Sequence, residues 1–157
     1  MKLAKKAEET IQDDPRSIRD PAIHKRLELM VFDEAIPHTW GCMFYRFLRK
    51  HKLGSEDAIA GNQYFQLVKD HERLQGTDPD ELPEHQRDLA YRRIRRAKKR
   101  CNEIREHVIG FGRRILDPLL FDEVYPTSEK EHIIAKLCLA NLKIYFATGT
   151  KRERNVV

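Results

Sequence analysis

Residues 87–100 read Arg-Asp-Leu-Ala-Tyr-Arg-Arg-Ile-Arg-Arg-Ala-Lys-Lys-Arg, a strongly basic stretch with a helical pattern. Eight of its residues are basic and one, Asp88, is acidic. Small and apolar side chains recur through it and beyond it at alternating spacings of four and three, at Ala90, Ile94, Ala97, Cys101, Ile104, Val108 and Phe111. This spacing predicts a long helix that begins near Pro83, packs its apolar seam against a neighbour and ends or bends at Gly110 and Gly112.

The first half of the chain is also patterned for helices, and no stretch alternates in the way a β-hairpin requires. Asp20 followed by Pro21 predicts the start of a helix that must stop before Pro37. We expect Thr39 to cap a second helix. Its apolar face holds Trp40, Phe44, Phe47 and Leu48.

A third helix is expected between Ser55, as its cap, and Gly76. Its buried stripe consists of Tyr64, Leu67, Val68, His71 and Leu74. A short segment, 113–121, follows the long basic helix, and Pro118 is expected to limit its regularity.

The last helix has the clearest boundaries in the sequence. Ser128 and Glu131 have the spacing of a capping box, and Gly149 is expected to lie just past the end. From Ile133 to Phe146 the segment is apolar almost all round, which is typical of a central or interface helix. The sequence therefore predicts this helix as the core of the bundle.

Length and composition indicate one folded domain. The chain has 157 residues, of which 40% are hydrophobic and 35% charged, enough to build one sizeable core. We predict an all-α fold, a single compact helical bundle of five to seven helices around the apolar C-terminal helix. Residues 1–19 are expected to form a charged, flexible arm, 20–149 the domain and 150–157 a basic tail.

The cysteines and the lengths of the apolar runs indicate where in the cell the protein is expected. Three widely spaced cysteines, Cys42, Cys101 and Cys138, stand among apolar helix positions, so we expect buried free thiols rather than disulfides or a zinc site. No run approaches the 18 apolar residues of a membrane span, and no apolar signal core follows Met1. A cytoplasmic protein without a membrane partner is expected.

The net charge of +5 arises entirely in the second half of the chain. Residues 1–83 hold 13 Lys and Arg against 15 Asp and Glu, whereas residues 84–157 hold 17 against 10. Such a concentration of positive charge favours a polyanionic partner, and phosphate backbones are the commonest polyanion. Any such site is therefore expected in the second half.

Within the basic helix, four side chains point away from the apolar seam, and we expect them to contact phosphates: Arg92, Arg95, Arg96 and Lys99. Further contacts are expected from Arg113 and Arg114, with the tail residues Lys151, Arg152 and Arg154 as extensions. The helix is rich in Arg and Lys and poor in Asn and Gln, which favours backbone contact over base reading. The sequence thus predicts a regulatory or accessory protein that binds nucleic acid, in the first place DNA.

Two other interpretations of this helix stay open. In the first, Glu84, Asp88, Glu103 and Glu106 offset the charge of the basic face, which is then simply exposed to solvent. In the second, the basic face binds an acidic protein. The alternative function is a helical interaction or homo-oligomeric module without nucleic-acid binding. Its homodimer or partner surface would be the last helix or the exposed part of the Trp40–Leu48 face.

Signals for catalysis or cofactors are thin. Glu129 and His132 have the Glu-x-x-His spacing of a di-iron bundle, but no second copy exists. Glu103 with His107 and His24 with Glu28 have metal-ligand spacing, yet such pairs are more often solvated contacts on one helix face. We therefore expect no catalytic residue, no cofactor and no metal, and an enzyme is the least favoured class.

Several short motifs suggest a family. They are Phe47–Leu53, Ala60–Tyr64, Arg92–Ala97, Pro126–Lys130, Ala140–Leu142 and Tyr145–Phe146. In these the chain resembles, from about Trp40 to Gly149, small helical proteins of uncharacterised function from alphaproteobacterial genomes and prophages, some carrying a helix-turn-helix segment. This chain departs from that pattern at Tyr125, where members often have Trp, and in an Ala-Thr insertion before Gly149. The resemblance implies a regulatory or mobile-element role near DNA, and it supplies no catalytic residues.

Overall fold

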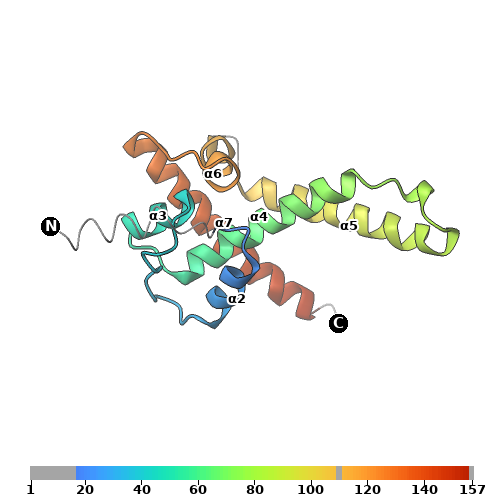
Figure 1. The fold of residues 1–157 in the computed structure, drawn as a ribbon, viewed down its shortest axis with the longest axis horizontal. Helices are drawn as coiled ribbons and strands as arrows, with labels where there is room; N and C mark the ends of the chain where they lie inside the picture. The colour runs from blue at the N-terminus through green and yellow to red at the C-terminus, as the bar shows by residue number, and fades with distance from the viewer. Residues whose placement is uncertain (1–16, 109–110, 156–157) are drawn as a thin grey trace.

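The protein is all-α, as the sequence predicts (Figure 1). The computed structural model describes residues 17–108 and 111–155. Within these ranges the chain forms six α-helices and one short 3-10 helix: α2 (Pro21–Leu29), α3 (Met43–Lys50), α4 (Ser55–Gln75), η1 (Pro79–Glu81), α5 (Glu84–His107), α6 (Phe111–Phe121) and α7 (Glu129–Asn155). The predicted helical bundle is thereby confirmed.

Helices α4 and α5 form an antiparallel hairpin whose outer half projects from the rest of the molecule as an arm (Figure 1). The short helix η1 lies at the turn between them, next to the start of α5. The apolar seam predicted for α5 is confirmed, because Cys101, Ile104 and Val108 are buried and Ala90, Ile94 and Ala97 are half-buried. The arm therefore holds the basic segment on the outside of a helix pair.

The body of the molecule packs around the aromatic face of α3 and the inner face of α7. Trp40, Phe44, Phe47 and Leu48 are all buried, as their spacing predicts. Ile18 is also buried, so the packed region begins before Asp20. Residues 1–16, most of the predicted arm, lie outside the described residues.

Polar contacts tie α7 and α6 to α4. Lys143 on α7 pairs with Asp57 at 2.8 Å, and Asp57 also accepts a hydrogen bond from the Gly54 backbone at the start of α4. Tyr64 donates a 2.6 Å hydrogen bond to Asp117 on α6, and burial raises the pKa of this carboxyl above its usual range. All three predicted free cysteines are confirmed as buried thiols.

Two predicted helix starts are wrong by a few residues. Helix α3 begins at Met43 with Cys42 as its cap, not at Thr39, because Trp40 closes a turn onto the Pro37 carbonyl instead of entering the helix. Gly54, not Ser55, is the cap of α4. The Ser55 hydroxyl is buried and donates to the Val31 carbonyl, so it is used between segments rather than at the helix end.

The predicted start of α7 is confirmed, and its predicted end is wrong. Glu131 accepts hydrogen bonds from the Thr127 and Ser128 backbone, Ser128 Oγ accepts one from Glu131, and these contacts hold the pKa of Glu131 below its usual range. The helix then runs through Gly149 to Asn155. One interior glycine costs about 1 kcal/mol, too little to stop a helix that has already run for more than five turns from Glu129.

Helix α7 lies in the core along one side only. One side is buried, at Ala135, Leu139 and Leu142, whereas Leu137 and Ile144 on the other side are exposed. No helix in the described ranges has the length and hydropathy that crossing a bilayer requires.

Candidate nucleic-acid interface

Four cations of α5 point away from its apolar seam. Arg92, Arg95, Arg96 and Lys99 are all exposed, and they are called here the outer basic face. Helical spacing places them within about two turns, a stripe roughly 10 Å long. Within residues 17–108 and 111–155 none of the four forms an ion pair.

Acidic neighbours do not neutralise the outer basic face. Asp88 precedes Arg92 by four residues and Glu103 follows Lys99 by four, the spacing at which helix ion pairs form. Neither pair meets within 4.0 Å in the described structure, and both carboxylates are exposed. Exposed pairs of this kind contribute little even when they do form. The four positive charges are therefore available to a ligand.

A groove of about 340 Å³ runs between α4 and the neighbouring flank of α5. Its polar lining is Asp70, Arg73, Arg93, Arg96 and Arg100, and its floor is Leu67, Leu74 and Ala97. Four guanidinium groups thus surround one carboxylate, and Arg73 reaches that carboxylate at 3.8 Å. Arg96 belongs to both the groove and the outer basic face, so the two form one continuous cationic surface.

Sequence reasoning missed the contribution of α4 to this surface. Arg73 lies twenty residues before Arg93 in the chain and in a segment whose net charge is negative. Only the antiparallel pairing of α4 and α5 brings the two guanidinium groups to one groove. A sequence-level signal existed in the short connection 76–83, which favours antiparallel neighbours.

The other predicted contacts lie on different helices. Arg113 is half-buried on α6 and faces Asp117 at 3.9 Å. Arg114 is exposed on α6 and lines a shallow hollow with Tyr125 and Glu131. The structure thus places neither on the α5 stripe. The side chains of Lys151, Arg152 and Arg154 lie outside the described residues.

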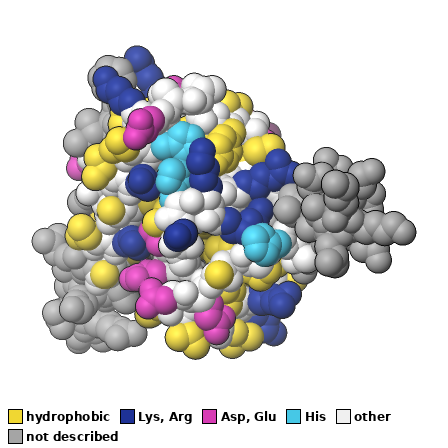
Figure 2. All heavy atoms as spheres, turned by 90° about the vertical axis from the view of Figure 1, so that its left-hand side faces the viewer, with side chains coloured by type: hydrophobic (Ala, Val, Ile, Leu, Met, Phe, Trp, Pro, Cys, Tyr) yellow, Lys and Arg dark blue, Asp and Glu magenta, His cyan; other side chains and the backbone are white. Residues whose placement is uncertain are grey.

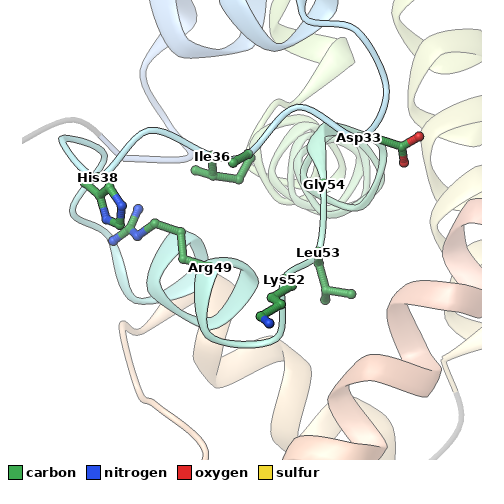
Figure 3. Close-up of a pocket in the computed structure, with 8 residues that line it drawn as sticks. Asp33, Ile36, His38, Arg49, Lys52, Leu53 and Gly54 are labelled. Carbon is green, nitrogen blue, oxygen red and sulfur yellow. The ribbon is translucent and has the colours of Figure 1, made fainter.

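A second hollow, of about 390 Å³, lies between the loop that follows α2 and the turn before α4 (Figure 3). His38, Arg49 and Lys52 line it, and the Asp33 side chain points away from Arg49. The Arg49 guanidinium donates to the backbone carbonyls of Pro37 and Trp40. Because this guanidinium already holds the loop closed, the hollow offers a ligand fewer free donors than the groove along α5.

The end of the molecule opposite the arm has a mixed surface. Figure 2 faces this end and shows Lys and Arg side chains among His, hydrophobic and acidic ones. Residues 87–100, in contrast, hold eight cations for one carboxylate. The arm is therefore the stronger candidate for polyanion contact.

His132 has a structural use. Its Nδ1 accepts a 2.7 Å hydrogen bond from His51 Nε2, and its own Nε2 donates to the Pro126 carbonyl at 3.1 Å. The ring also stacks on Phe47, with centroids 5.5 Å apart. Both nitrogens are thus occupied by hydrogen bonds within the fold. Among the described residues no group of three or more ligand side chains occurs.

The contact between His51 and His132 leads us to expect a loss of folding stability in mild acid. Burial, first, and then Lys136, His132 and Lys50 lower the pKa of His51 from its usual 6.5. The unfolded chain therefore takes up the proton more readily, and folding stability falls as the pH drops through about 6.5. We expect the melting temperature of the wild type to fall between about pH 7.5 and 5.5 and that of His51→Gln to fall less.

The control for this experiment is His85→Gln, since His85 is exposed on α5 and belongs to no such pair. Its melting temperature is expected to follow the wild type at each pH. Thermal unfolding followed by circular dichroism makes the measurement. If the melting temperatures of the wild type and His51→Gln changed identically with pH, His51 would not be the source of the acid sensitivity.

Comparisons with known proteins found no matching family model, no similar curated protein and no similar solved structure. The resemblance to small prophage-associated helical proteins therefore stays a prediction. Function has to be argued from the geometry of this chain.

Proposed function

We propose that the protein binds nucleic acid, in the first place duplex DNA, along the outer basic face of α5 and acts as a regulatory or accessory factor. The observation that carries the proposal is the exposure of four unpaired cations within about two helical turns. Charges held this close repel one another, and a phosphate backbone relieves the repulsion. A role near DNA is also what the sequence resemblance implies.

The shape of the arm suits contact with a backbone. The outer half of the α4–α5 hairpin projects beyond the body (Figure 1), which favours the approach of a duplex to α5. The groove guanidinium groups, Arg73 among them, extend the cationic surface to the side of the helix. Neighbouring phosphates are the natural ligands for these groups.

Binding is expected to depend on salt more than on sequence. Residues 87–100 contain no Asn or Gln, the side chains that read adenine, and Arg and Lys serve phosphates as readily as guanines. Contacts to about four to six phosphates give a slope of about −4 to −5 in a plot of log affinity against log salt concentration.

The test is a fluorescence-anisotropy titration of the full chain with labelled duplexes of unrelated sequence, repeated over a range of salt. We expect similar affinities for all DNA duplexes and the slope just given. A duplex RNA of equal length distinguishes DNA from RNA as the preferred partner. Absence of binding at low salt would refute the proposal.

A further inference from the structure

A row of apolar side chains on α7 is left uncovered. Ile133, Leu137 and Ile144 are large, and 47%, 60% and 63% of their surfaces are exposed. Ala140, which is half-buried, lies between Leu137 and Ile144, and the exposed Ala147 follows Ile144. The five positions follow spacings of four, three, four and three, so they form one stripe along the helix. We call this stripe the outer seam of α7.

The outer seam is separate from the side of α7 that holds the bundle together. The buried positions, Ala135, Leu139 and Leu142, lie on the opposite side and face α4 and α6. A scattered exposed leucine needs no explanation, whereas a row of large apolar residues at coiled-coil spacing is typical of a helix that packs against another helix. The folded chain supplies no such helix to the outer seam in the described ranges.

The far end of α7 also lacks neighbours in the bundle. In Figure 1 the last turns of this helix extend past α2 and α4 at the lower right. A helix segment outside a folded body is marginal in water unless its apolar side is packed. Up to Phe146 the inner side of α7 still packs on the bundle, through Leu142, Tyr145 and Phe146, whereas Ile144 and Ala147 are exposed on its other side.

We propose that the partner is a second copy of this chain, and that the two α7 helices pair antiparallel about a two-fold axis near Ala140. In this register Ile133 lies opposite Ala147 of the second copy, and Leu137 lies next to Ile144 of the second copy. The two Ala140 residues meet at the axis, where small side chains let helices approach closely. Each contact then occurs twice, once on either side of the axis, as a two-fold interface requires. At each end of the contact a large residue meets a small one.

The charges of α7 favour the antiparallel direction and a second copy. The helix begins Glu129-Lys130-Glu131 and ends Lys151-Arg152-Glu153-Arg154. Glu129 and Lys151 are each eleven residues from Ala140, so the two-fold axis brings the acidic start of one helix to the basic end of the other. A parallel pair would place like charges together at both ends, and its helix dipoles would also oppose it.

This inference does not rest on nucleic-acid binding, because the outer seam and the outer basic face share no residue. Their tests are therefore independent. If both hold, the dimer carries two basic arms. If the dimer fails, the proposal for α5 is unaffected.

Sedimentation velocity of the full chain tests the dimer. We expect the wild type to pass from monomer to dimer as its concentration rises through about 10 to 200 µM, at the weak end of the affinities that protein interfaces reach. The double variant Leu137→Glu/Ile144→Glu is expected to stay monomeric, because four carboxylates would meet in the contact. The matched control Leu89→Glu/Val124→Glu changes two exposed apolar residues elsewhere and is expected to dimerise like the wild type.

Single cysteines test the register. Ala140→Cys is expected to form a disulfide with itself, whereas Ile133→Cys links only when mixed with Ala147→Cys, since the two Ile133 positions lie about 20 Å apart along the antiparallel axis. A parallel pair would link every variant to itself. The wild type, whose native thiols are buried, gives the background. A monomeric wild type throughout, or efficient self-linking of Ile133→Cys, would overturn the proposal.

Discussion

A variant with glutamate at all four positions of the outer basic face is expected to lose on the order of a hundredfold or more in affinity for duplex DNA at low salt. Each substitution removes a phosphate contact and adds a negative charge that repels the backbone. The four positions are Arg92, Arg95, Arg96 and Lys99. They are exposed and do not contribute to the apolar seam of α5, so the variant is expected to fold.

The matched control carries the same change in net charge away from the arm. Four exposed lysines serve this purpose: Lys25, Lys50, Lys52 and Lys130. If attraction to DNA depends only on the overall charge of the protein, the two variants lose the same affinity. If it depends on the α5 stripe, the control retains most of its binding. Equal loss in folded samples of both variants would contradict a localised site.

Replacing Gly61 with alanine is expected to destabilise the fold, although alanine is the better helix former. Gly61 lies inside α4, where an added Cβ would stand 2.6 Å from Phe44 Cε2 and closer still to Cζ. The Phe44 ring is buried in the core and cannot move aside freely. Overpacking costs about 1–3 kcal/mol, and the helix propensity of alanine returns about 1 kcal/mol.

Two ring atoms nearer than 3.0 Å place the overpacking cost in the upper part of this range, at about 2–3 kcal/mol, so we expect a net loss of about 1–2 kcal/mol, which lowers the melting temperature by roughly 2–8 °C. Gly76→Ala is the control, because a Cβ there meets only ordinary contacts, 3.5 Å from the Arg73 carbonyl. That variant is expected to be neutral or slightly more stable than the wild type. In a Phe44→Leu background the cost of Gly61→Ala should shrink, since the clashing ring atoms are gone. An unchanged or raised melting temperature in Gly61→Ala alone would refute the close approach of α3 and α4.

Local rules predicted the parts of this fold that local chemistry fixes. The capping box at Ser128 and Glu131 and the Asp20–Pro21 start both depend on neighbouring residues, and both are confirmed. The seam of α5 was predictable because its spacing allows only one face to be buried. Gly149 shows the limit of such rules, since a glycine that is a frequent stop signal lies inside α7.

What the sequence left open depends on contacts between distant segments. The composition of α7 shows that it is apolar, but not which side the bundle covers, so the outer seam emerged only with the fold. Arg73 is part of the groove only because α4 and α5 pair. The spacing of Glu129 and His132 suggests a metal ligand, whereas the structural role of His132 depends on the hydrogen bond from His51, which is distant in the sequence.

Binding of a phosphate backbone by the outer basic face of α5 is best tested by comparing the salt dependence of DNA binding between the wild type and the four-glutamate variant. The measured quantity is the slope of log affinity for one duplex against log salt concentration. We expect a slope of about −4 to −5 for the wild type, and a slope smaller by about one for each single Arg→Ala or Lys→Ala change within the face. Binding by the four-glutamate variant is expected to be close to undetectable. The same slope and affinity in the wild type and the four-glutamate variant would contradict it.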